Sequence, residues 1–272
     1  MAIITISRGT FSGGKALAEC VAERLGFRCI SREVLVKAAR DHSVPLEKLS
    51  KALDEVPGIL ERTNLERVHY LAYVQEALTK EVKDEQVVYH GLAGHLLLKG
   101  VPHVLKVRVI ANMEFRIKAA MERRNLNWHN AIKSIEKIDV RRDKWVRFLY
   151  HVDRNDPSIY DLTINLDRIS LSSACEIVCL NASQAEFRAT PESKERLADL
   201  VLSAEVRAKI ASDDNIADDR IEIEAHDGII TIGGTVHSLE DADRTRELVR
   251  RQPGVKGIES RLRALIQTEI SW

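Results

Sequence analysis

Long apolar runs are absent from this sequence of 272 residues. It contains no stretch of eighteen apolar residues, the length at which a helix could cross a bilayer, so no transmembrane helix is expected. The chain opens directly on a short β-branched stretch, which predicts no signal peptide and a cytoplasmic protein. Cysteine is scarce, and no Cys-x-x-Cys pair occurs, so we expect reduced, buried thiols at Cys20, Cys29, Cys175 and Cys179.

Net charge is also lacking, since 41 Lys and Arg balance 41 Asp and Glu. A strongly basic surface, the usual mark of a nucleic-acid-binding protein, is therefore not expected. The balance conceals an asymmetry, because residues 192–272 contain 12 basic and 17 acidic side chains and the preceding part contains 29 and 24. Together with the length, this predicts two domains, the first mildly basic and the second acidic.

The most informative segment is the first one. Residues 2–6 are apolar and β-branched, and residues 16–25 have helical spacing. A glycine-bearing turn between a strand and a helix can hold phosphates, because its backbone N–H groups turn inward and the helix start adds positive potential. A lysine at the end of the turn reaches the outer phosphates. We predict a nucleoside triphosphate site formed by Gly9, Thr10, Phe11, Ser12, Gly13, Gly14, Lys15 and Ala16.

Strands and helices alternate over residues 1–182, which predicts a parallel five-stranded sheet flanked by helices. The expected strands are 2–6, 28–30, 86–90, 103–110 and 160–165. The expected helices are 16–25, 32–39, 114–124, 172–180 and a long region over 46–83 that is interrupted at Pro57-Gly58. We expect residues 128–150 to form a mobile, basic helical pair.

A polar linker at 183–192 precedes a second pattern, which predicts a small α+β domain over 193–270. Its expected order is a helix at 194–211, strands at 220–225 and 229–236, a helix at 239–252 and a last strand at 255–266. Gly228, Gly233 and Gly234 are interpreted as turn and bulge glycines.

Several segments of the first domain resemble the cytidylate kinase-like family of P-loop nucleoside monophosphate kinases. They are Ile4-Thr-Ile-Ser-Arg8 with Ser12-Gly-Gly-Lys15, Val107-Arg-Val-Ile-Ala111 with Glu114-Phe-Arg116, Asp139-Val-Arg-Arg142 and Asp156-Pro-x-x-Tyr160-Asp-Leu-Thr-Ile-Asn165. The resemblance implies phosphoryl transfer from ATP, with Mg²⁺, to a nucleoside monophosphate or another small phosphorylated acceptor.

The same resemblance implies roles for individual residues. Lys15 and the loop amides would hold the donor's phosphates, and Asp139 would orient an arginine of the lid. Arginine suits contacts to the transferred group because its planar fork binds phosphate oxygens in pairs. The candidates are Arg116, Arg123, Arg124, Arg141 and Arg142, of which Arg141 and Arg142 match the lid motif best. Each of them could equally lie on a solvated helix face.

Two positions depart from the family pattern. Ala16 replaces the hydroxyl residue that binds magnesium, so the ion would be held through water or by another carboxylate. Gly91-Leu-Ala replaces the Gly-Arg-Asp that holds the acceptor nucleotide, which argues against CMP as the acceptor. A nucleotide-binding sensor without turnover, or a scaffold with a vestigial kinase fold, is therefore an alternative. His90, His95 and His103 lack a carboxylate at useful spacing, and no metal site is predicted there.

The second domain resembles the BON module through Asp227-Gly-x-Ile-Thr-Ile-x-Gly-Thr-Val236 and Pro253-Gly-Val-Lys-Gly257. The resemblance implies contact with a protein or with phospholipid. A lipid surface attracts basic faces, whereas this half of the chain is acidic. Both partners stay open.

Overall fold

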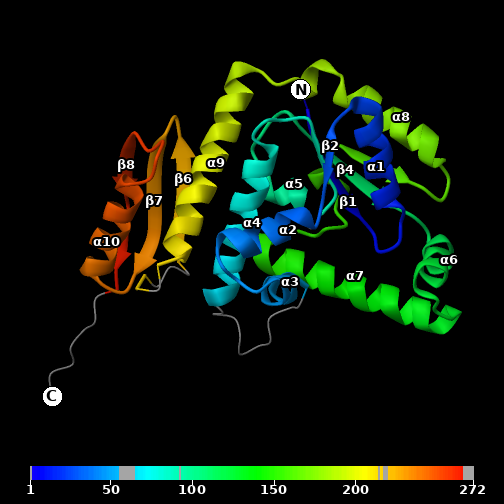
Figure 1. Cartoon of the computed structure of the whole chain (residues 1–272), viewed down its shortest axis with the longest axis horizontal. Helices are drawn as coiled ribbons and strands as arrows, with labels where there is room; N and C mark the ends of the chain where they lie inside the picture. The colour runs from blue at the N-terminus through cyan, green and yellow to red at the C-terminus, as the bar shows by residue number, and fades with distance from the viewer. Residues whose placement is uncertain (1, 55–64, 92, 214, 217–219, 266–272) are drawn as a thin grey trace. The chain divides into compact units, whose positions relative to one another are not determined.

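The structure is a computed structural model that describes residues 2–54, 65–91, 93–213, 215–216 and 220–265 (Figure 1). Contacts divide the chain into two compact units. The first contains Met1–Val34, Leu53–Val56 and Asp84–Ser193, and the second contains Leu35–Ala52, Pro57–Lys83 and Lys194–Trp272. Within the described part, no helix combines the length and the apolar character needed to cross a membrane.

The first unit is built on a five-stranded sheet in the order β2-β3-β1-β4-β5. All neighbouring strands are parallel, which confirms the predicted α/β fold. The strands are β1 (Ile3–Arg8), β2 (Arg28–Ile30), β3 (Val87–Tyr89), β4 (Val104–Ile110) and β5 (Leu162–Asn165). Ser7 on β1 lies opposite Arg108 on β4, so these two side chains share one face of the sheet.

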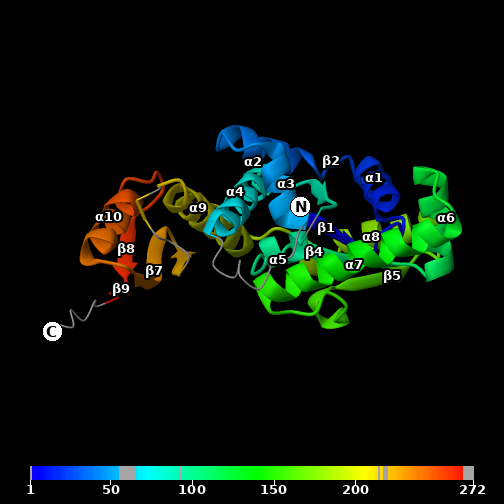
Figure 2. The ribbon, with the colours of Figure 1, turned by 90° about the horizontal axis from the view of Figure 1, so that it is seen from below.

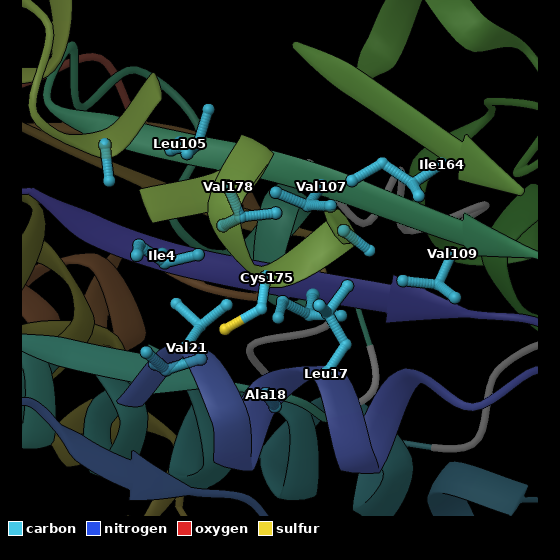
Figure 3. Packing of buried hydrophobic residues seen from close by; sticks show 14 of the residues in the cluster. Ile4, Leu17, Ala18, Val21, Leu105, Val107, Val109, Ile164, Cys175 and Val178 are labelled. Carbon is cyan, nitrogen blue, oxygen red and sulfur yellow. The ribbon is translucent and has the colours of Figure 1, made fainter. Parts of the chain in front are cut away.

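Two helices, α1 (Gly14–Leu25) and α8 (Leu171–Ala182), pack on one face of this sheet. Figure 3 shows Ile4 and Val107 from the strands against Leu17 of α1 and Cys175 of α8. Alternation along the strands sends Ser7 and Arg108 to the opposite face. Cys175 is a buried free thiol, as predicted, whereas Cys20, Cys29 and Cys179 are free but only partly buried.

Helices α6 (Met113–Arg124) and α7 (Trp128–Tyr150) lie next to each other (Figure 2). They pack through a small apolar cluster near the start of α7. The prediction of a helical pair over 128–150 was wrong, because α7 is one helix of 23 residues. The segment contains no glycine or proline that would break it, and Asn127 caps only its beginning by accepting a hydrogen bond from the Asn130 N–H at 2.9 Å.

The remaining elements of the first unit are short. They are α5 (Gly94–Leu97) and the single 3₁₀ turns η2 (Pro157–Ile159) and η3 (Ala185–Phe187). Helix α2 (Glu33–Asp41) begins in the first unit and ends in the second. Asp156 caps η2 by accepting a hydrogen bond from the Ser158 N–H at 2.8 Å. The turn precedes β5, the edge strand of the sheet, which pairs with β4.

The C-terminal part has the predicted order of helix, two strands, helix and strand. Its elements are α9 (Pro191–Ala211), β6 (Ile221–His226), β7 (Ile229–Val236), α10 (Leu239–Arg250), β8 (Gly257–Ser260) and β9 (Arg263–Ala264). The predicted last strand is divided in two, with β8 pairing to the first half of β7 and β9 to its end. Gly234, at a φ of 99°, lies between these two pairings, and a Cβ there would lie 1.8 Å from the Arg220 carbonyl oxygen, so the position requires glycine.

The second unit also contains α4 (Leu65–Val82) and all but the last two residues of α3 (Leu46–Asp54). The Tyr73 hydroxyl of α4 donates to the carbonyl of Ala211 at the end of α9, at 2.9 Å. Lys80 of α4 lies 3.8 Å from a carboxylate oxygen of Glu205 on α9. The predicted interruption at Pro57-Gly58 lies outside the described residues, and the boundary at 183–192 stays a prediction.

Candidate functional site

The loop between β1 and α1 has the backbone that a phosphate cradle requires. Phe11 and Gly13 take positive φ values of 61° and 86°. A Cβ on Gly14 would lie 2.7 Å from the Arg8 Cβ, so only glycine fits there. The Ser12 hydroxyl donates to the Gly9 carbonyl at 2.9 Å, with a second carbonyl, that of Val109, at 3.1 Å. These contacts fix the loop at the carboxyl edge of the sheet.

Lys15 lies in the first turn of α1 with a side chain that is 60% exposed. Within the described part of the chain, its Nζ has one ion-pair partner, the carboxylate of Glu19 one helical turn further on, at 3.5 Å. An exposed pair of this kind is weak and gives way readily to a phosphate. The ammonium group is therefore available to a ligand at the loop.

Asp139 joins α7 to the loop. Its Oδ1 accepts from the Thr10 hydroxyl at 2.7 Å and from the Thr10 backbone N–H at 3.3 Å. Its Oδ2 forms an ion pair with Arg116, whose Nε also donates to the Thr10 carbonyl at 2.8 Å. Arg142 donates to the Thr10 hydroxyl at 3.3 Å. The structure thus brings four predicted site residues into contact.

The protonation of Asp139 follows from these contacts. Burial acts to raise its pKa, but the Thr10 hydrogen bond and the Arg116 ion pair outweigh burial and hold the pKa below its usual range. The carboxylate is therefore charged at neutral pH. A charged Asp139 keeps both Thr10 and Arg116 in place.

The remaining predicted arginines lie apart from this cluster. The Arg124 guanidinium lies 5.1 Å from the centroid of the Phe11 ring, which connects α6 to the loop by a cation–π contact. Arg123 is exposed, and Arg141 is partly buried with an Nε that has no hydrogen-bond partner among the described residues. Neither forms a hydrogen bond to the loop within the part of the chain that the structure describes.

A cavity of about 280 Å³ lies beside the loop, and sequence reasoning missed most of its polar lining. Its walls are Gly9, Arg108, Ile110, Ala111, Arg116, Asp139, Asp143, Arg154 and Asn155. Arg108 and Arg154 are each only 5% exposed. One signal was available in the sequence, because Arg108 lies within a mainly apolar strand that is expected to be buried on both faces.

His90 and His95 are buried neutral side chains. Burial and then the positive charge of Arg8 lower the pKa of His90 to about 4, and burial and then Arg108 lower that of His95 to about 3. The one group of three potential metal ligands among the described residues is Asp199, His226 and Asp227 in the C-terminal part. There Asp199 accepts hydrogen bonds from the backbone N–H groups of Asp227 and Gly228, at 3.1 and 3.2 Å, and so stabilises the β6–β7 turn.

The sequence profile of the cytidylate kinase-like family matches residues 3–168. The chain belongs to this family. It is 30% identical over 183 residues to a cytidylate kinase of Staphylothermus marinus, a match that covers 65% of this chain and 94% of that protein. It is 29% identical over 171 residues to a cytidylate kinase of Methanothrix thermoacetophila, covering 61% and 89%. The cytidylate kinase-like resemblance predicted from the sequence is thus confirmed, and kinase chemistry is supported at the level of the family.

A solved structure of an uncharacterised protein from Eubacterium ventriosum matches the fold, with a TM-score of 0.52 and 18% identity, over 68% of this chain and 100% of that one. The BON domain profile matches residues 198–265, which confirms the second predicted resemblance. That region is 29% identical over 65 residues to the osmotically-inducible protein Y of Escherichia coli, covering 24% of this chain and 32% of that protein. The chain therefore spans about a third of that relative.

Proposed function

We propose that this cytidylate kinase-like protein transfers the terminal phosphoryl group of ATP to a nucleoside monophosphate or a similar small phosphorylated acceptor. The observation that carries the proposal is the contact of Thr10, in the phosphate loop, with Asp139 and Arg142 of α7. A lid helix that binds the loop directly can bring its arginines to the donor's phosphates when the nucleotide arrives.

Phosphoryl transfer requires positioning and positive charge more than covalent chemistry. Backbone N–H groups of residues 12–16 and the Lys15 ammonium group would hold the donor's β- and γ-phosphates. Arg116 and Arg142, already at Thr10, would neutralise charge that develops on the transferred group. Arg123, Arg124 and Arg141 lie on the same two helices and stay candidates for further phosphate contacts.

Magnesium is best treated as part of the MgATP substrate. Ala16 offers no side-chain oxygen, and the carboxylate bound to the loop, Asp139, is already taken by Thr10 and Arg116. The ion would therefore contact this chain through water or through another carboxylate, and Asp143 lines the cavity beside the loop.

The test is a panel of nucleoside monophosphates, including CMP, UMP, AMP and GMP, with MgATP and continuous measurement of ADP. We expect turnover with at least one acceptor and a loss of about 100-fold or more in kcat for Lys15→Ala, since a charge that acts on the transferred phosphoryl group is removed. Arg24→Met is the matched control, because Arg24 lies in the last turn of α1, partly exposed and paired with Glu176.

A nucleotide sensor is the second candidate, favoured by the replacement of Gly-Arg-Asp with Gly91-Leu-Ala. Calorimetry that shows ATP binding, together with no turnover on any acceptor, would select the sensor over the kinase. The BON domain would then carry the signal to a partner.

For the BON domain we propose a protein partner over phospholipid, because its half of the chain carries five more acidic than basic side chains. Flotation of the full chain with anionic vesicles at low salt tests this choice, and co-flotation would overturn it. We further propose that the protein acts in the cytoplasm, where ATP is available.

A further inference from the structure

Two buried arginines face the cavity beside the phosphate loop. Arg108 lies in the middle of β4, and Arg154 lies in the short connection between α7 and η2. Each is 5% exposed, and both line the cavity. Burying a guanidinium costs free energy unless a counter-charge lies nearby and its N–H groups donate hydrogen bonds. The partners of each arginine therefore indicate whether its charge is balanced within the protein.

Arg154 is fully matched by carboxylates. Its Nε donates to Asp143 Oδ1 at 2.7 Å, and its Nη2 lies 2.7 Å from the same oxygen and 3.8 Å from Asp139. The backbone carbonyl of Arg154 accepts from the Tyr160 hydroxyl at 3.0 Å, which fixes the connection itself. Arg154 is therefore held rigidly at the wall of the cavity.

Arg108 is matched only by neutral groups. It donates to the Ser7 hydroxyl at 3.1 Å and to Asn155 Oδ1 at 3.3 Å, and its guanidinium lies 5.8 Å from the centroid of the Tyr160 ring. These two hydrogen bonds use two of its five N–H groups. Among the described residues, no carboxylate lies within ion-pair distance of Arg108.

The charges that line the cavity therefore do not cancel. Arg116 is paired with Asp139 and Arg154 with Asp143, so the described lining has three guanidinium groups and two carboxylates, and Arg108 has no carboxylate in contact. Burial, and then the neighbouring charge of Arg154, lower the pKa of Arg108 below its usual range, and the more distant Asp139 and Asp143 offset this only in part. A bound anion would relieve both effects.

We propose that Arg108, Arg154 and Asn155 form a subsite that binds the phosphate monoester group of the acceptor. The inference rests on the proposed kinase function and names the residues that supply the charge missing from Gly91-Leu-Ala. The cavity borders Gly9, the first residue of the donor loop, so a phosphate bound there lies next to the donor's terminal phosphate. In the reaction, an oxygen of the acceptor phosphate forms a bond to the γ-phosphorus, the bond from that phosphorus to the β–γ bridging oxygen breaks, and ADP leaves with the electron pair.

Two other roles for these three residues are distinguishable by experiment. They could bind the terminal phosphate of ATP instead of the acceptor's phosphate, or they could form a cluster that only anchors α7 to the sheet and binds no phosphate. Two variants separate these cases: Arg108→Met removes the uncompensated charge at similar length, and Asn155→Asp adds a carboxylate beside Arg108. Asn155 is exposed, so its variant is expected to fold even if Arg108→Met does not. Arg24→Met again serves as the control.

The experiment measures three quantities on the full chain: the affinity for ATP, the affinity for inorganic phosphate in the presence of ADP, and KM for the best nucleoside monophosphate. For both variants we expect phosphate affinity to fall and KM to rise by about 30-fold, with ATP affinity within about twofold of the wild type. Reduced ATP affinity with an unchanged KM would assign the cavity to the donor instead. If both affinities and KM stayed unchanged in both variants, the residues would only anchor α7 to the sheet. Either of these two outcomes overturns the inference.

Failure of the kinase proposal would be visible separately. If the wild-type protein phosphorylates no acceptor, the kinase proposal fails, while the phosphate titration still tests the subsite. Binding of inorganic phosphate that is lost in Asn155→Asp and kept in Arg24→Met would support an anion subsite. Equal phosphate binding by all proteins, or none by the wild type, would overturn it.

Discussion

One face of the five-stranded sheet packs Ile4, Val107 and their neighbours against α1 and α8 (Figure 3). The other face buries Ser7 and Arg108. The apolar face gains its stability from area removed from water, which is insensitive to the exact partners. The polar face must satisfy each hydrogen bond and charge individually. The first face therefore maintains the fold, and the second face can be specialised for binding without loss of the core.

The sharpest test of this difference uses two adjacent positions of β4. Val107→Asp places a charge in the apolar face at a fully buried position, and we expect a loss of more than about 4 kcal/mol in unfolding free energy. Arg108→Met, one residue further on, should cost less than about 2 kcal/mol, since a buried charge is replaced by an apolar chain of similar length. Urea unfolding of the full-length variants measures both. Equal losses would contradict the division between the faces.

A pH-dependent effect of intermediate size is expected at His95, whose ring lies 4.7 Å from that of Tyr160 on the polar face. Because burial lowers its pKa to about 3, the unfolded chain binds a proton below pH 6.5 that the folded chain does not. Stability should therefore fall as the pH drops from 6.5 toward 3. For His95→Phe, the loss between pH 7 and pH 5 should be smaller by about 2 kcal/mol. Urea midpoints at the two pH values measure this difference, and parallel losses in both proteins would refute it.

The smallest expected effect concerns the Tyr160 hydroxyl, which donates to the Arg154 carbonyl. Tyr160→Phe should lower the free energy of unfolding by about 1 kcal/mol, the usual value of one hydrogen bond. Since the ring stays in place over Arg108, KM for the acceptor should change less than in Arg108→Met. A calorimetric melting curve with acceptor kinetics checks both points. A larger kinetic defect in Tyr160→Phe than in Arg108→Met would show that the hydroxyl itself contacts the ligand.

The fold was largely predictable because its signals are local. The glycines of the phosphate loop and the β-branched strands indicate their conformations within a few residues of sequence. The single helix α7 differs from the predicted helical pair, because no glycine or proline in residues 128–150 interrupts it. The two-part pairing of β7 was not predicted either, because it depends on the register between segments that are distant in the sequence.

The site was only half predictable. Thr10, Arg116, Asp139 and Arg142 stand in motifs, and the structure brings them together. The cavity arginines depend on pairings that no short segment reveals, because Ser7 and Arg108 lie 101 residues apart in the chain. Arg154 stands in no recognised motif, and its ion pair with Asp143 depends on where α7 ends, which the sequence does not indicate.

The contact of Tyr73 with Ala211 affects how the two halves of this gene product could be separated. Because α4 and α9 belong to the same unit, a chain truncated before residue 191 would keep α4 but lose Ala211 and Glu205, which contact its Tyr73 and Lys80. Domain-deletion experiments on this protein would then alter the remaining fragment as well as remove the C-terminal part, and point substitutions in the intact polypeptide are the safer way to assign roles to each half.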